Sequence, residues 1–179
     1  GALLARLQEA PDQLLAIEVH AGRVELAAEE VGELLLRDEL RAKPCGAGLI
    51  DAAKNNIWSI ATSMASAKPT PEIRLGLVAY RDRGDDYVTK VLDLSGDMDS
   101  MYAALMDFRA DGGGDGPESV NQALHDAVHR IGWSQDSNSY KVIFLVGDAA
   151  PHMDYANDVP YPETLEIAAQ KGIIVNCIQ

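Results

Sequence analysis

The sequence has few basic residues, few cysteines and no long apolar run. It contains 15 Lys and Arg against 28 Asp and Glu, a formal net charge of −13 over 179 residues. This charge argues against a nucleic-acid partner, because phosphate contacts need clustered basic side chains. It suits a cation or a basic partner, or serves only solubility. No stretch of 18 apolar residues is present, so we expect no membrane-spanning helix.

The cysteines and the serines indicate neither a metal cluster nor a catalytic set. Cys45 and Cys177 stand far apart without metal-type spacing, so neither a zinc site nor a disulfide framework is indicated. Cys177 falls in an apolar stretch, where we expect a buried thiol. No serine has a plausible His–Asp partner order, and the glycine-rich stretch 111–119 lacks the Gly-Lys-Ser/Thr of a phosphate loop. We therefore expect a protein that is not an enzyme.

Apolar periodicity from residue 49 onward predicts alternating strands and helices. The expected strands are 73–80, 87–94, 140–147 and 173–178, and the expected helices are 49–65, 97–108, 117–131 and 162–170. A short charged turn joins the first two strands, which favours an antiparallel pair. The pattern as a whole predicts an α/β fold: an open, mostly parallel, doubly wound sheet with helices on both faces and one antiparallel edge strand.

The first 48 residues differ from the rest in composition, being rich in Ala, Leu and Glu. They predict strands at 14–19 and 23–27 and a helix at 29–41. The stretch Lys43 to Gly48 contains a proline and two glycines, and such residues break regular structure. We therefore divide the chain into an N-terminal extension, 1–48, and a domain, 49–179.

Two acidic loops mark the predicted carboxyl ends of the strands. One runs from Asp111 to Ser119 and opens a helix, and the other begins at Asp148, directly after the apolar strand 140–147. Oxygen ligands at strand ends and helix starts are how an open α/β sheet holds a hard divalent cation.

Four stretches, residues 49–54, 73–82, 112–120 and 143–148, together resemble a von Willebrand factor type A domain. They are most similar to bacterial stand-alone members with a Gly-Gly-Gly-Asp-x-Pro-Glu loop. The resemblance implies a Rossmann-like sheet, a metal-ion-dependent adhesion site at the carboxyl ends of the strands, and a function in protein interaction or adhesion. It also implies that the domain is incomplete after strand 173–178, because the family continues with another helix and an edge strand.

In this family three loops hold the cation, usually Mg²⁺, with Mn²⁺ or Ca²⁺ as substitutes. The resemblance implies Asp148 as the third-loop ligand and Asp115 as the second-loop ligand, with Glu118 and Ser119 as lesser candidates. The first-loop motif, Asp-x-Ser/Thr-x-Ser, is not matched, because Arg41 to Cys45 stand in its place. Their positive charges would repel Mg²⁺. A metal is therefore expected only if other residues supply this loop.

The missing first loop also raises the question of the central strand. In the family the first strand lies between the strands placed here at 73–80 and 140–147. An empty slot would leave two rows of unpaired backbone groups, which a buried sheet does not tolerate. Residues 14–19 are the best candidate by composition, and residues 34–36 lie closer in sequence to the domain.

Two hypotheses of function follow. In the first, the chain binds a protein partner at the loop face, with His152, Asp154 and Tyr155 as contact residues on an exposed loop and a divalent cation assisting. The alternative is a degenerate structural or assembly domain without a functional metal site. Two further motifs have plain interpretations: His125 and His129 lie on a solvated helix face, and Arg83-Gly84-Asp85 is a turn of mixed charge.

Overall fold

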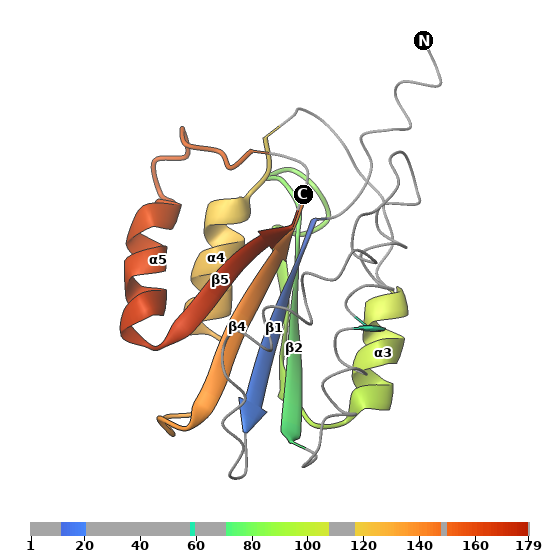
Figure 1. The fold of residues 1–179 in the computed structure, drawn as a ribbon. Coiled ribbons are helices and arrows are strands. Elements are labelled where there is room, and N and C mark those ends of the chain that lie inside the picture. The colour runs from blue at the N-terminus through green and yellow to red at the C-terminus, as the bar shows by residue number, and fades with distance from the viewer. Residues whose placement is uncertain (1–11, 21–57, 60–70, 108–116, 148–149, 179) are drawn as a thin grey trace.

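The protein is a mixed α/β structure with one five-stranded sheet. The computed structural model describes residues 12–20, 58–59, 71–107, 117–147 and 150–178. The strands are β1 (Asp12–His20), β2 (Glu72–Tyr80), β3 (Thr89–Ser95), β4 (Ser139–Val146) and β5 (Ile173–Ile178). The helices with described bounds are α3 (Met98–Asp107), α4 (Val120–His129) and α5 (Tyr161–Gln170). Figure 1 shows α4 and α5 on one face of the sheet and α3 on the other, as the sequence predicts.

The strand order is β3-β2-β1-β4-β5, so β1 lies at the centre of the sheet (Figure 1). This confirms that residues 14–19 fill the slot between β2 and β4. The prediction of a mostly parallel sheet is wrong: β1 is antiparallel to both neighbours, β2 and β3 are antiparallel, and only β4 and β5 pair in parallel within the described chain. Composition selected the strand but not its direction, because backbone groups can be satisfied by a neighbour of either direction. The predicted antiparallel edge strand is confirmed in β3.

The direction of β1 defines the two edges of the sheet. We call the edge where β2, β4 and β5 end the carboxyl edge. Asp12, the first residue of β1, pairs with Tyr80 at this edge, whereas His20 pairs with Glu72 and Ser139 at the opposite edge. The carboxyl end of β1 therefore lies on the side of the sheet away from the carboxyl edge. The predicted boundary near residue 48 and the elements at 23–27, 29–41 and 49–65 lie wholly or largely outside the described residues.

The main core lies between α4 and the sheet. Helix α4 buries Ala123, Leu124, Ala127 and Val128, which recur at helical spacing along one side. Buried residues of the strands oppose them, among them Val78 and Ile143. Strand β4 is buried from Lys141 to Phe144, which confirms the prediction of a strand covered on both faces.

Strand β5 and the start of α4 differ from the prediction. Because β5 is an edge strand, Ile174 and Cys177 are exposed, and the expected buried thiol at Cys177 is wrong. Helix α4 begins at Val120 and not at Pro117, because Glu118 forms an isolated parallel bridge with Pro151. Because residue 118 pairs as an extended strand residue, the first helical turn begins after it.

A buried carboxylate joins three segments at the edge opposite the carboxyl edge. Glu18 of β1 is 0% exposed and forms an ion pair with Arg74 of β2. Its second oxygen accepts a hydrogen bond of 2.6 Å from the backbone N–H of Ser134, in the loop before β4. A buried charge is tolerated when it is paired and hydrogen-bonded. Glu18 therefore ties the central strand to both neighbouring segments.

We predict that Glu18→Ala lowers the free energy of unfolding by about 2–3 kcal/mol, because it leaves the Arg74 guanidinium and the Ser134 N–H without this acceptor. Urea unfolding followed by circular dichroism measures the change. The matched control is Glu72→Ala, an exposed glutamate on β2, which should change stability by less than about 0.5 kcal/mol. Equal effects of the two substitutions would contradict this role of Glu18.

Candidate functional site

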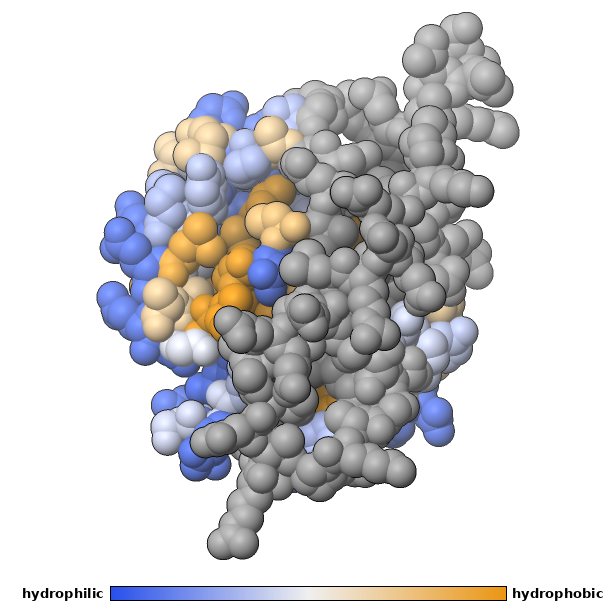
Figure 2. Space-filling view, in the orientation of Figure 1, coloured by the Kyte–Doolittle hydropathy of each residue, from blue (hydrophilic) through white to orange (hydrophobic). Residues whose placement is uncertain are grey.

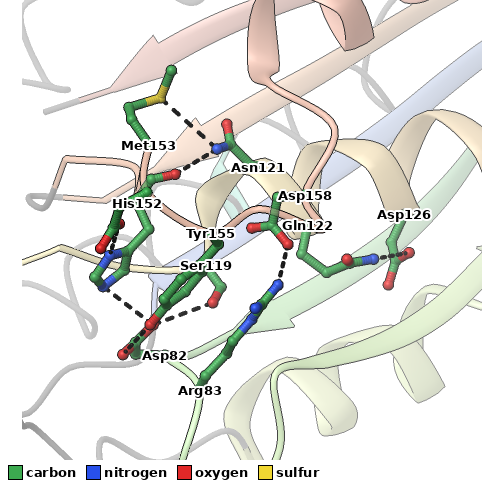
Figure 3. A network of polar contacts seen from close by, with 11 residues as sticks. Asp82, Arg83, Ser119, Asn121, Gln122, Asp126, His152, Met153, Tyr155 and Asp158 are labelled. Atoms are coloured by element: carbon green, nitrogen blue, oxygen red, sulfur yellow. Dashed lines mark hydrogen bonds and ion pairs between the residues drawn. The ribbon is translucent and has the colours of Figure 1, made fainter.

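Asp82 is the centre of a polar network at the carboxyl edge (Figure 3). It lies two residues after β2, in the turn to β3, where Gly84 adopts a φ of 104° that favours glycine. The Tyr155 hydroxyl lies 2.8 Å from Oδ1 and 3.0 Å from Oδ2 of Asp82. Ser119, which precedes α4, donates its hydroxyl proton to Oδ1 at 3.3 Å. One carboxylate thus connects the β2–β3 turn, the start of α4 and the loop before α5.

His152 lies inside this network and not on an exposed loop, so the sequence-based expectation is wrong. Only 7% of the residue is exposed, and its ring stacks on Tyr155 with centroids 4.1 Å apart. Nδ1 lies 2.8 Å from Asp154 Oδ1; since an ionised carboxylate only accepts, this contact places the proton on Nδ1. Nε2 lies 3.4 Å from Asp82 Oδ1, an ion-pair distance when the ring is protonated. The imidazole therefore stands between two carboxylates.

Arg83 closes the other side of Tyr155. Its guanidinium carbon lies 4.0 Å from the centre of the tyrosine ring, and the same group forms an ion pair with Asp158. Tyr155 is thus held between a cation and an imidazole. These contacts occupy the arginine of the Arg83-Gly84-Asp85 tripeptide within the fold, which agrees with its interpretation as a turn.

Backbone contacts and one buried amide fix the loop that follows β4. The N–H of Glu118 donates to Ala150 and the N–H of His152 donates to the carbonyl of Glu118, at 2.9 and 3.0 Å. Asn121, only 2% exposed, donates to the His152 carbonyl at 2.6 Å and accepts the Tyr161 N–H at 3.0 Å. The start of α4 thereby holds both ends of the segment between residues 150 and 161.

The predicted metal ligands are only partly described. Asp115 and Asp148 lie outside the described residues, and Glu118 contributes its backbone to the bridge with Pro151. Ser119 is fully buried. Its hydroxyl fits a hard cation in donor chemistry, because a hydroxyl that gives its proton to Asp82 keeps its lone pairs. Within the described ranges, no group of three or more His, Cys, Asp or Glu side chains is arranged to hold a metal ion.

The histidine pair on α4 lies apart from this network, near the end of the helix. The rings of His125 and His129 stack with centroids 4.5 Å apart. His129 is exposed, as predicted for a solvated helix face. His125 is half-buried and agrees with that prediction only in part. Burial and then the positive charge of Lys171 lower the pKa of His129. A neutral ring avoids like-charge repulsion in the stack.

Sequence reasoning did not select Asp82, Asn121, Met153 or Asp158 for the site, and it took Arg83 only as part of a turn. Asp82 carried a usable signal, because it follows an apolar strand in the same way as Asp148. Arg83 and Asn121 carried none, since their partners Asp158 and Tyr161 lie 75 and 40 residues away. Of the predicted contact residues, His152 and Tyr155 meet in the network and Asp154 joins it through His152.

Comparison of this chain with family models, with curated proteins and with solved structures found no match. The resemblance to a von Willebrand factor type A domain therefore stays a prediction that rests on four stretches of sequence. In the described part of the chain, no helix is both long and apolar enough to span a bilayer.

The contact between His152 and Asp154 predicts a pH effect. The hydrogen bond from His152, and next the backbone hydrogen bond, lower the pKa of Asp154 below its ordinary 3.8. A lowered carboxyl pKa stabilises the fold above pH 3.8, and this stabilisation is lost as the pH falls through the lowered value. In a ¹³C NMR titration of the carboxyl groups, Asp154 should titrate below 3.8.

The substitution His152→Phe keeps an aromatic ring beside Tyr155 but removes the N–H donor. It should raise the pKa of Asp154 toward 3.8. Asp97 serves as an internal control, because Ser100 is the main cause of its lowered pKa and that contact is remote from His152. An unchanged Asp154 titration in the variant would show that the hydrogen bond is absent in solution.

Proposed function

We propose that this chain is a non-enzymatic protein-interaction module of the von Willebrand factor type A kind, which binds a partner at the carboxyl edge of its sheet. The observation that supports this most is the network around Asp82. It joins the end of β2, the start of α4 and the loop between β4 and α5 into one surface. Loops fixed on a rigid scaffold at a sheet edge are where binding residues concentrate.

The loop between β4 and α5 is suited to binding because contacts of His152 and Tyr155 with the rest of the fold already order it. Tyr155 is held between His152 and Arg83. Asp154 is exposed, and Met153 is 61% exposed, with its sulfur 3.9 Å from the Asn121 amide nitrogen. An ordered loop loses less conformational entropy when a partner docks. Methionine is enriched in interface cores, whereas acidic residues favour the rim. Met153 would therefore enter a pocket of the partner and Asp154 would meet a basic or hydrogen-donating group beside it.

The burial of Ser119 supports binding over catalysis. A serine nucleophile needs access to a substrate as well as a base. The Ser119 hydroxyl donates to the Asp82 carboxylate, but the residue is fully buried.

A divalent cation would assist this surface through oxygen ligands. Asp148 and Asp115 would hold it, with Glu118 and Ser119 as lesser candidates, and Asp82 would orient the Ser119 hydroxyl from behind, as outer partners commonly do. When bound, the ion would attract a carboxylate of the partner. Mg²⁺ suits this donor set, with Mn²⁺ or Ca²⁺ as substitutes.

The alternative is a related domain without a functional metal site, used in assembly. The direction of β1 favours it. In the family the first metal loop directly follows the central strand, but here β1 ends at His20, on the edge away from Asp82. A first loop at the carboxyl edge must then come from another part of the chain.

The interaction is tested by capture of a partner on the immobilised chain from extracts of the source cells. Met153→Ala should reduce the apparent affinity at least tenfold, a loss of about 1.4 kcal/mol. Tyr102→Ala is the matched control, since Tyr102 is an exposed large residue on α3, on the other face of the sheet. A captured protein that is retained equally by both variants would place the interface elsewhere.

The role of metal is tested by thermal unfolding with Mg²⁺ or Mn²⁺ against EDTA. Free metal at ten times its dissociation constant stabilises the native state by about 1.4 kcal/mol, which raises the midpoint by roughly 3–6 °C for a chain of this size. Asp148→Asn should abolish the shift. Asp99→Asn, in the first turn of α3 and exposed, should preserve it. No shift at millimolar metal would favour the metal-free alternative.

A further inference from the structure

An apolar cleft opens between the sheet and helices α4 and α5, beside the loop that follows β4. Its volume is about 360 Å³. Tyr80, Leu145 and Val175 of three strands form its floor, and Leu124 and Leu165 line it from the helices. Cys177 of β5 also lines it and is exposed. In the view of Figure 2, hydrophobic residues gather over β5 and beside α5.

The size of this cleft exceeds an ordinary packing defect. Protein interiors have few voids larger than a water molecule, whereas small-molecule sites span about 300–1,000 Å³. Water inside walls of this kind finds few hydrogen-bond partners. Replacing that water by an apolar molecule is therefore favourable.

The chemistry of the lining selects a neutral occupant. Among the described residues, no charged side chain lines the cleft. The polar groups of its side chains are the hydroxyls of Tyr80 and Tyr161 and the thiol of Cys177, and the Tyr80 hydroxyl contacts the Val146 carbonyl at 3.4 Å. An ionised ligand would lose its hydration there without a compensating partner. The net charge of −13 further disfavours an anion.

The cleft is also held open by a buried polar side chain. Asn121, 2% exposed, hydrogen-bonds to the carbonyl of His152 and to the N–H of Tyr161. Pro151, next to His152, and Tyr161 both line the cleft. One amide on α4 thus fixes two parts of its rim, as expected of a largely preformed site.

We propose that this cleft is a binding site for a small neutral molecule with an apolar, aromatic or aliphatic body. The lining of this cleft does not include Met153, although Asn121 supports both sites. Its test uses a small-molecule probe and variants of β5, so its failure and the failure of the interaction function proposed above are distinguishable.

The probe for the test is N-phenyl-1-naphthylamine, a neutral fluorophore, titrated into the full chain. Its emission should rise to saturation with one site per chain. Cys177→Trp should weaken binding at least tenfold by filling the cleft. Asn176→Trp is the matched control, because the neighbouring side chain on β5 points to the opposite face of the sheet, and it should bind as the natural chain does. Non-saturable emission, or equal binding by the two variants, would overturn the proposal.

Two further measurements keep the test independent of how the variants fold. The anionic analogue 8-anilinonaphthalene-1-sulfonate should bind the natural chain at least tenfold more weakly than the neutral probe, and equal binding would contradict a neutral site. The neutral probe should also slow labelling of Cys177 by a thiol reagent at least fivefold, measured by peptide mass so that Cys45 does not interfere. Unchanged labelling at saturating probe would show that the occupant lies elsewhere.

Discussion

The backbone hydrogen bonds of the central strand are the constraint on which the rest of the structure depends. Strands β2 and β4 each need a partner on their inner side, and β1 supplies both rows. A strand that begins at Asp12 is thereby inserted between segments that begin at residues 72 and 139. Glu18 reinforces this insertion with side-chain contacts to Arg74 and Ser134. The β2 end, the α4 start and the loop after β4 keep their relative positions only because this sheet is continuous.

The candidate site follows from that continuity. Asp82 follows β2, and Tyr155 reaches it from the loop between β4 and α5, on the other side of the central strand, while Ser119 reaches it from the start of α4. The same part of α4 supplies Asn121, which fixes the loop on which His152 and Met153 lie. The proposed partner surface and the apolar cleft are thus neighbours that share one support, although the first is polar and ordered by charge and the second is lined by apolar side chains. We therefore propose a protein partner for the surface and a small neutral molecule for the cleft.

Much of the local structure could be predicted because it depends on nearby residues. The strands β2, β4 and β5 and the helices α3 and α5 lie within one or two residues of the predicted bounds, since apolar periodicity is a local signal. The predicted start of α4 was three residues too early, because Glu118 pairs with Pro151, 33 residues later in the sequence. Cys177 was placed in the core because its strand is apolar, but an edge position leaves one side of a strand uncovered. In both cases a distant segment decided the outcome.

The sequence by itself determined which segments form strands and helices, that residues 14–19 suit a central strand, and that acidic residues gather after strand ends. It did not determine the direction of β1, because apolar composition is the same read from either end and a ladder forms either way. Tertiary structure alone brought Asp82, Ser119, His152 and Tyr155 together and enclosed the imidazole between two carboxylates. These contacts join residues up to 73 positions apart, and no local pattern encodes such a distance.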